Sequence, residues 1–328
     1  RRNVANYVRA LRTMLGDQFN TSDFHRVRNI ISDGVNNNFC KRDKYGINPV
    51  ERCLSTAHLF SELIAPDRNI TIATLLYNFS RENFVSTEEI RQSFGEDVAK
   101  LVQGLINISS LYTKQAAVED DNFHKLLFTF AEDIRVIIIM IVDRLQLMRR
   151  INHHPDEKFV RDISSEARYL YAPLAHRLGL YTIKSELEDL SLKYLNRKIY
   201  TQIAEKLNES KEVRDSYVTH FIEPIRERLQ DSNIKFEIKG RTKSINSIWN
   251  KMKKKDVDLN EMYDLFAIRI ILDSPQKQEK QDCWIAYSIV TDIYTANVSR
   301  LKDWISIPKS NGYESLHITV KGPQSKWV

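Results

Sequence analysis

The stretch NIKFEIKGRTKSINSIWNKMKKK, from Asn233 to Lys255, marks the point at which the sequence changes character. Residues 233–240 alternate apolar and polar side chains, which predicts a strand with one buried face. Residues 244–255 predict a short helix directly after that strand. A strand followed at once by a helix indicates that a mixed α/β region begins here.

The sequence after Lys255 continues this mixed pattern. Residues 265–272, LFAIRIIL, are an uninterrupted apolar run rich in β-branched side chains, which predicts a buried strand. A helix is predicted over residues 282–294 and an alternating strand over residues 315–322. The C-terminal part is therefore expected to combine helices with a sheet.

The chain before Asn233 is predicted to be helical. Apolar residues recur at i, i+3 and i+4, and glycine is scarce, with 9 in 328 residues. Ser86 or Thr87 is expected to cap a helix whose first turn carries Glu88 and Glu89. The predicted helices cover residues 3–15, 50–64, 70–80, 86–108 and 133–151, then 164–195 with interruptions near Pro173 and Gly179, and finally 197–231.

The composition excludes several classes of protein. Hydrophobic residues make up 42% and charged residues 28%, which is typical of a soluble globular chain long enough for two domains. The longest strongly apolar run, residues 136–142, is far too short to span a membrane, and the N-terminus has no signal-peptide pattern. Cys40, Cys53 and Cys283 form no CxxC pair, which favours a reducing, cytoplasmic location and argues against zinc.

Positive charge is concentrated in one segment of a chain whose net charge is +6. Between Lys235 and Lys255 there are eight Lys or Arg residues and one acidic residue. Arg241 and Lys243 follow the predicted strand, and Lys251 lies one turn beyond Ser247 on the predicted helix. Because a helix N-terminus attracts anions, this arrangement suits a polyphosphate, with Ser244 or Ser247 at the start of the helix.

The alternative interpretation of these cations is a solvated basic helix face. We favour it for residues 253–255. For Arg241, Lys243 and Lys251 the spacing supports both interpretations equally.

Two further segments carry candidate ligands. Asp264 precedes the predicted buried strand that contains Arg269, where a carboxylate beside a phosphate site would suit Mg²⁺; alone, such an Asp is more often a strand-end cap or the partner of a nearby Lys. The segment SRLKDWISIPKSNGYESLH, residues 299–317, offers Tyr313 as a stacking surface for a base, or else as an aromatic residue at the edge of the core. The same segment offers Arg300, Lys302, Lys309 and His317 to phosphates and Asn311 to a base or sugar.

Six segments occur in the order and spacing of one bacterial family: FGEDVAKLVQG, EDIRVIIIMIVDRLQLMR, YAPLAHRLGLYTIKSELEDLSLKYL, GRTKSINSIWNKM, YDLFAIRII and SRLKDWISIPKSNGYESLH. They resemble the RelA/SpoT-homologue family of alarmone synthetase/hydrolases. The resemblance implies an α+β multidomain protein. Its expected parts are an all-α HD-type domain at 1–155, a helical connecting bundle at 156–195 and a mixed α/β, nucleotidyltransferase-like synthetase domain at 196–328.

The resemblance also implies a reaction, namely transfer of pyrophosphate from ATP to the 3′-hydroxyl of GDP or GTP in the stringent response, with Mg²⁺ as cofactor. Asp264 matches the family's Mg²⁺ ligand. The ATP side corresponds to Arg241, Lys243, Ser247, Lys251 and Arg269, and the acceptor side to Lys302, Lys309, Asn311, Tyr313 and His317. The family's second catalytic acid, a Glu in a Glu-x-Gln strand, is expected beyond Val328. The ribosome is an expected partner only through regulatory regions that are not in this sequence.

The family's hydrolase site is expected to be degenerate in this chain. The resemblance places its Mn²⁺ ligands at Asn48, Tyr77, Asn78 and Asp143, and only Asp143 keeps the family's residue type. The acidic pair that handles the attacking water reads Arg81-Glu82. We therefore expect neither Mn²⁺ binding nor alarmone hydrolysis in the N-terminal half.

Two other functions stay open from the sequence. One is a catalytically silent nucleotide-binding regulatory module, because the second catalytic acid is not in this chain. The other is an RNA- or ribosome-associated module that uses the basic residues 251–255, which a pI near 9.0 permits.

Overall fold

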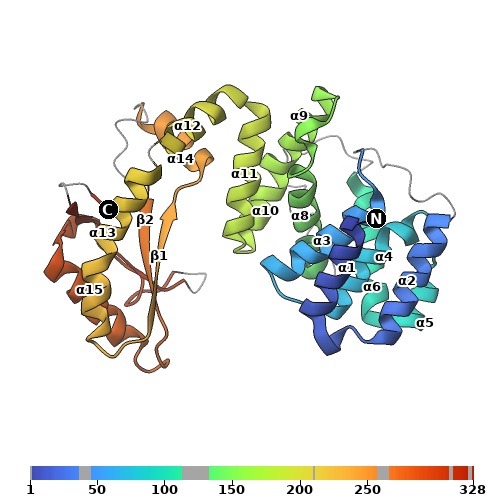
Figure 1. Cartoon of the computed structure of the whole chain (residues 1–328), viewed down its shortest axis with the longest axis horizontal. Coiled ribbons are helices and arrows are strands. Elements are labelled where there is room, and N and C mark those ends of the chain that lie inside the picture. The colour runs from blue at the N-terminus through green and yellow to red at the C-terminus, as the bar shows by residue number, and fades with distance from the viewer. Residues whose placement is uncertain are drawn as a thin grey trace. The chain divides into compact units, whose positions relative to one another are not determined.

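The computed structural model of the chain describes residues 2–36, 46–112, 133–209, 211–256, 266–309, 313–323 and 327–328. The chain forms two compact units, Arg1–Arg197 and Lys198–Val328. Figure 1 shows the first as a group of helices, coloured blue to yellow-green, and the second as a mixture of helices and strands, coloured yellow to red. The predicted α+β multidomain fold is confirmed.

The first unit is entirely helical in its described residues and has one continuous hydrophobic core, which runs from Leu11 to Leu187. Its helices are α1 (Arg2–Leu15), α2 (Thr21–Asn36), α3 (Pro49–Leu63), α4 (Arg68–Arg81), α5 (Thr87–Phe94), α6 (Glu96–Tyr112), α8 (Ile134–Met148), α9 (Glu157–Glu166), α10 (Ala172–Arg177) and α11 (Tyr181–Leu195), with short turns η1 (Gly16–Gln18), η2 (Ile151–His153) and the π-helical η3 (Ala167–Tyr171).

Polar side chains in the connections fix where these helices begin. Ser86 caps α5 in a reciprocal capping box with Glu89, as the sequence predicts. Asp67 caps α4 by accepting from the backbone N–H of Ile70 at 2.8 Å. Each such cap satisfies backbone donors that the helix itself leaves without a partner, so these start positions follow from local sequence.

Two predicted helices are each divided in the structure. The run predicted over residues 86–108 breaks at Gly95, whose φ of 100° lies in a region that favours glycine, and becomes α5 and α6. The charged helix predicted over residues 197–231 is two helices, α12 (Arg197–Glu209) and α13 (Lys211–Gln230). The predicted interruptions near Pro173 and Gly179 are confirmed, since η3, α10 and α11 meet there and Gly179 has a φ of 74°.

Gly95→Ala is expected to lower the free energy of unfolding of the helical unit by about 1–3 kcal/mol, because Ala adopts this backbone conformation only under strain. A Cβ at this position would meet no other atom within 4 Å, so the cost is conformational and not steric. Urea unfolding measures it. Gln92→Ala, at an exposed position of α5, is the control and should change stability by less than about 0.5 kcal/mol. Equal stability of the two variants would contradict this account of Gly95.

Helices α9 to α11 share the core of the preceding helices. Leu170 and Leu187 belong to the same buried cluster as Ile139 of α8. Arg149 donates to Glu186 of α11 at 2.5 and 2.7 Å, and the Tyr194 hydroxyl donates to the backbone carbonyl of Met148 at 2.9 Å. The predicted domain boundaries near residues 155 and 195 stay a prediction.

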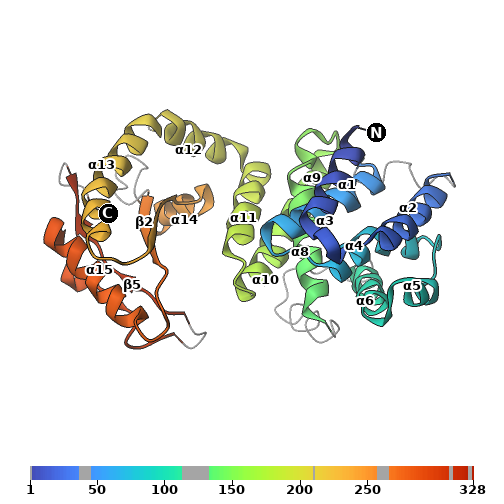
Figure 2. The same cartoon turned by 60° about the horizontal axis from the view of Figure 1, so that its bottom comes forward.

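The second unit is built on an antiparallel pair of strands, β1 (Phe236–Thr242) and β2 (Phe266–Leu272). Their apolar side chains pack against α13 and α15 (Glu279–Ile293) (Figures 1 and 2). The pairing runs from Phe236↔Leu272 to Thr242↔Phe266. The further described elements of the unit are α14 (Ile245–Lys255), η5 (Val298–Arg300), β3 (Thr295–Ala296), β4 (Lys302–Asp303), β5 (Leu316–His317) and β6 (Val320–Lys321). Strand β3 pairs with β6, and β4 pairs with β5.

The prediction that residues 265–272 form a fully buried strand is wrong. In β2, Ile268 and Ile270 are half-buried against the core, whereas Ala267 and Arg269 are exposed and Ile271 is 39% exposed. Among the described residues β2 pairs only with β1, and helices α13 and α15 supply the core on one side. A strand covered on one face shows alternating burial even when its sequence is continuously apolar.

Helix α14 rests on a small core of its own. Ile248 of α14 and Ile203 of α12 are buried together, with Trp249 and Met252 partly buried around them. Figures 1 and 2 both show α12 and α14 side by side. The basic helix is thus held by α12 through a cluster separate from the one that supports the sheet.

None of the helices within the described ranges has both the length and the hydrophobicity needed to cross a membrane.

Candidate functional site

The connection between β1 and α14 has the form predicted for an anion site. Ser244 is the helix cap, since its Oγ accepts from the backbone N–H of Ser247 at 3.3 Å and lies 2.8 Å from the Ser247 Oγ. Lys243 precedes this cap and Lys251 follows it on the same helix. Lys243 is thus adjacent in sequence to the N-terminus of α14, where backbone N–H groups favour anions, and Lys251 lies further along the same helix.

The remaining predicted ATP-side residues are only partly described. The backbone of Arg241 belongs to β1, paired with Ala267, while its side chain lies outside the described part of the structure. Asp264 also lies outside it, two residues before Phe266. Because Phe266 pairs with Thr242, the chain enters β2 at the same end of the ladder at which β1 passes into Lys243.

The acceptor-side residues are organised by the short hairpin of β4 and β5. Lys302 pairs with His317, and Asp303 pairs with Leu316. The Asp303 Oδ1 accepts from the backbone N–H groups of Ile305 and Ser306 at 3.0 and 2.8 Å, which folds the connection back on itself. Lys302 and His317 are thus fixed as neighbours by backbone pairing.

The connection between β4 and β5, together with His317 of β5, carries an aromatic and basic cluster. The Lys309 ammonium lies 4.9 Å from the ring centre of Trp304 and 5.1 Å from that of Tyr313, so it contacts both rings. The Tyr313 hydroxyl and His317 Nε2 are 2.9 Å apart, within hydrogen-bond distance. Because Lys309 covers one face of the Tyr313 ring, a base would stack on the other face or after Lys309 moves. Asn311 lies outside the described residues.

The cluster has a positive electrostatic environment. Desolvation lowers the pKa of His317, and the nearby charges of Lys302, Lys309 and Arg269 lower it further. Arg269, which the sequence assigns to the ATP side, therefore acts electrostatically on an acceptor-side residue. The structure brings together Arg269, Lys302, Lys309, Tyr313 and His317, whereas Ser247 and Lys251 lie on α14. Trp304 was not predicted, although an aromatic residue directly after the Lys-Asp pair could have signalled it.

His317 is expected to titrate below its ordinary pKa of 6.5 when followed by NMR. Since folding lowers this pKa, the unfolded chain binds the proton more tightly, and stability should fall as the pH drops below 6.5 towards the folded pKa. Lys302→Ala should raise the pKa, because it removes one repelling charge. Lys253→Ala, on α14, is the control and should leave the pKa of His317 unchanged. A His317 pKa at or above 6.5 in the unmodified protein would contradict the described environment.

In the helical unit, three of the four positions of the expected degenerate metal site lie in one cluster. Asn78 donates from Nδ2 to the Cys53 Sγ at 3.3 Å, and burial raises the pKa of Cys53 to about 11, with a further contribution from Asp143. Burial, and then Asp143, also raises the pKa of Tyr77. The fourth position, Asn48, caps α3, with its Oδ1 accepting from the backbone N–H groups of Val50 and Glu51 at 3.0 and 3.2 Å.

An arginine that the sequence analysis missed contacts the remaining carboxylate. Arg52 on α3 binds Asp143 on α8 with two nitrogens, Nε at 3.0 Å from Oδ1 and Nη2 against Oδ2. The Thr56 hydroxyl donates to the same Oδ1 at 3.2 Å. Arg52 stands among apolar neighbours on α3, and a charge in such a position signals a buried partner. Across the described ranges, no three His, Cys, Asp or Glu side chains are grouped so that they could share a metal ion.

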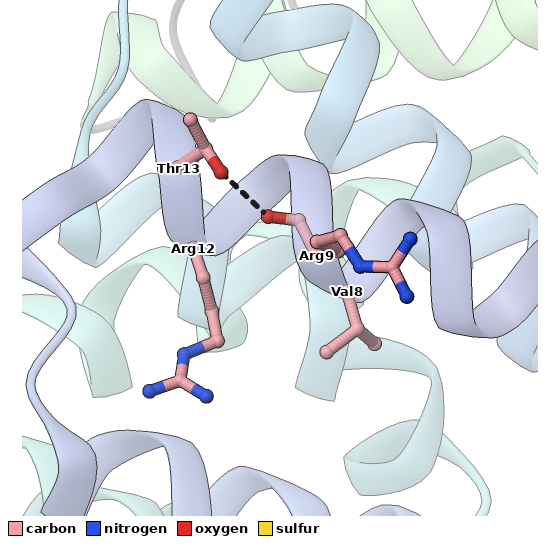
Figure 3. A pocket seen from close by; sticks show the side chains of 4 residues that line it. All are labelled: Val8, Arg9, Arg12 and Thr13. Atoms are coloured by element: carbon pink, nitrogen blue, oxygen red, sulfur yellow. Dashed lines mark hydrogen bonds between the residues drawn. The ribbon is translucent and has the colours of Figure 1, made fainter.

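A hollow on the helical unit lies apart from all predicted site residues. It is lined by Val8, Arg9, Arg12 and Thr13 of α1 and has a volume of about 500 Å³. Figure 3 shows the Thr13 hydroxyl donating to the Arg9 carbonyl within it, at 3.1 Å. None of these four described lining residues is acidic, and Arg12 is also held over the ring of Phe24, 4.8 Å from its centre.

The comparisons with known proteins cover both regions. Residues 35–181 match a family described as "HD domain", and residues 240–328 match one described as "Region found in RelA / SpoT proteins". The chain belongs to the RelA/SpoT-homologue family. Among its relatives is a GTP pyrophosphokinase of Myxococcus xanthus, 35% identical over 290 residues, which are 87% of this chain and 37% of the relative.

Further relatives in the RelA/SpoT-homologue family carry either the same name or the name of a hydrolase. A GTP pyrophosphokinase of Photobacterium angustum is 33% identical over 272 residues, 81% of this chain and 36% of the relative. A guanosine-3′,5′-bis(diphosphate) 3′-pyrophosphohydrolase of Aquifex aeolicus is 35% identical over 287 residues, 87% of this chain and 39% of the relative. The chain thus spans less than two fifths of the length of these relatives, which by name include both pyrophosphokinases and a pyrophosphohydrolase.

Proposed function

We propose that the unit Lys198–Val328 binds ATP and GDP or GTP and contributes to pyrophosphate transfer between them, with AMP and (p)ppGpp as products. The observation that carries this proposal is the cluster of Lys302, Lys309, Tyr313 and His317 with Arg269 close by. A flat aromatic surface beside fixed cations suits a guanine nucleotide.

In the proposed reaction, the 3′-oxygen of the acceptor attacks the β-phosphorus of ATP in line. A bond forms between these atoms, the bond from the β-phosphorus to the bridging oxygen breaks so that AMP leaves with that oxygen, and the proton of the 3′-hydroxyl passes to water. Such transfer depends mainly on positioning and on neutralising phosphate charge. Lys243, Lys251 and the N-terminus of α14 would orient the triphosphate, and Lys302 and Lys309 the acceptor phosphates.

The donor set of this region is compatible with Mg²⁺. The ladder places the start of β2 beside the loop of Lys243, and Asp264 would add a carboxylate there to oxygens of the nucleotide, which together are the ligands that Mg²⁺ prefers. When bound, the ion would neutralise phosphate charge. Without it, a carboxylate at this position would repel the substrate.

Product analysis tests the synthetase proposal. The chain, and the longest protein that its gene encodes, are incubated with Mg²⁺, ATP and GDP or GTP, and the nucleotides are separated. We expect AMP and the 3′-diphosphorylated guanine nucleotide in equal amounts. Binding of both nucleotides without turnover in the longer protein would instead support a silent regulatory module. Salt-sensitive RNA binding without nucleotide binding would support the RNA-associated alternative.

We also propose that the helical unit does not hydrolyse ppGpp. Asn48, Tyr77 and Asn78 offer amides and a phenol where the family's hydrolase positions hold imidazole and carboxylate groups, and Arg81 occupies the position expected to handle water. The chain is expected to release no pyrophosphate from ppGpp with Mn²⁺, whereas the Aquifex aeolicus relative serves as the positive control. Measurable turnover by this chain would reject the proposal.

A further inference from the structure

The contact between Arg52 and Asp143 lies where the family resemblance places a metal ion. Asp143 is the one predicted ligand position that keeps a carboxylate, and its two oxygens accept from Arg52 and Thr56. The side chains of Arg52 and Asp143 are only 10% and 19% exposed. A carboxylate has about four acceptor positions, and three of them are used here by groups of the chain itself.

The other predicted ligand positions are also engaged within the helical unit. The side-chain carbonyl of Asn48 caps α3, and the side-chain amide of Asn78 donates to the Cys53 Sγ. Arg81 adds a second positive charge, which offsets a small part of the rise that burial causes in the pKa of Cys53 and Tyr77. The groups present are therefore two cations, a phenol, two amides, the Thr56 hydroxyl, the Cys53 thiol, whose pKa burial raises to about 11, and one occupied carboxylate. This set does not fit a divalent metal ion.

We infer that the Arg52 guanidinium replaces the divalent cation as the counter-ion of Asp143. In the helical unit, a side chain thus takes the place that the family resemblance gives to a metal ion. The planar guanidinium matches both carboxylate oxygens at once and remains charged at every physiological pH. Capture of Asp143 by a metal would break both hydrogen bonds between Arg52 and Asp143, whose side chains are mostly buried, and this is strongly unfavourable. The metal is thus excluded by an added cation as well as by lost ligands.

This inference rests on the proposed loss of hydrolase function, but its tests measure stability and metal binding, not turnover. The first test is a double-mutant cycle in the full chain. Asp143→Asn and Arg52→Met are each expected to lower the melting temperature by about 5–15 °C. The double variant should recover at least half of the melting temperature that the less stable single variant loses, because both charges of the pair are then removed together. Additive losses would overturn the inference.

The second test restores the family's ligands. A variant with Asn48→His, Tyr77→His and Asn78→Asp is expected to bind Mn²⁺ weakly, as measured by the electron paramagnetic resonance signal of the free ion. Adding Arg52→Met should tighten Mn²⁺ binding by about 100-fold. The matched control adds Arg68→Met, which removes an arginine that binds Asp23 with two nitrogens at 2.6 and 2.7 Å elsewhere in the unit. Equal Mn²⁺ affinity with and without Arg52, or a gain from Arg68→Met as large as that from Arg52→Met, would overturn the inference.

The unmodified chain supplies the third test. Its melting temperature in excess Mn²⁺ and in EDTA should agree within about 1 °C, since a ligand stabilises only a protein that binds it. A shift of several degrees upward with Mn²⁺ that persists after Asp264→Asn, which removes the carboxylate proposed to bind a metal in the other unit, would mean that the ion binds despite Arg52, and would overturn the inference. Hydrolase assays are not needed for any of the three results, so failure here and failure of the proposed function are separate outcomes.

Discussion

Asp264→Asn is expected to reduce (p)ppGpp synthesis by several orders of magnitude while the melting temperature stays nearly unchanged. The substitution keeps the size and hydrogen-bonding capacity of the side chain but removes the charge that a Mg²⁺ ligand needs. A strand-end cap would tolerate the same change at a cost of about 1 kcal/mol or less in stability. Product analysis on the longest protein that the gene encodes, beside a thermal melt, separates the two roles.

The opposite end of β2 offers a matched control for this experiment. Asp273 directly follows the strand, and its backbone N–H donates to the carbonyl of Lys235 at 2.8 Å, far along the ladder from Lys243. Asp273→Asn therefore removes a strand-end carboxylate without approaching the proposed phosphate site. Near-normal synthesis by Asp264→Asn, or an equal loss in both variants, would show that Asp264 does not hold the metal.

Tyr313→Ala is expected to weaken GDP binding by about 1–3 kcal/mol, a factor of roughly 5 to 150, because it removes the ring on which guanine is proposed to stack. ATP affinity should change little. Tyr313→Phe keeps the ring and loses only the hydroxyl that meets His317, so it should retain most of the affinity. Calorimetric titration with each nucleotide measures these differences.

The control for Tyr313 is Trp284→Ala on α15, which removes a 37% exposed aromatic side chain of the same unit. It should leave GDP and ATP affinity unchanged. If Tyr313→Ala weakens both nucleotides equally, or lowers the melting temperature enough to unfold the unit, Tyr313 is a packing residue at the edge of the core and the stacking proposal fails.

Local sequence predicted the elements whose boundaries depend on neighbouring residues. The capping box of Ser86 and Glu89 is a short-range interaction, so it could be predicted from four consecutive positions. The break at Gly95 could not, because a single glycine is tolerated inside a helix and only its backbone angle decides the outcome. The burial of β2 was overestimated for a non-local reason, namely how many layers cover the strand.

In the candidate sites too, contacts within one segment could be predicted, whereas contacts between distant segments could not. Lys309, Tyr313 and His317 lie within nine residues of one another, so their proximity could be expected from a single loop. Arg52 and Asp143 are 91 positions apart, and nothing in either segment states that the two helices meet at these residues. The family resemblance predicted which ligand positions have changed, but the cation that contacts Asp143 became visible only in three dimensions.

The small core shared by α12 and α14 has a consequence for dynamics. Among the described residues it contains two buried side chains, Ile203 and Ile248, whereas the cluster around the sheet contains nine. Local opening costs less where fewer apolar contacts must separate. In hydrogen exchange, the amides of α12 and α14 should therefore exchange as one foldon, ahead of those of α13 and α15. A polyphosphate bound at the start of α14 would slow this exchange in both helices. Binding at the site should therefore protect the amides of α12, although α12 carries none of the predicted site residues.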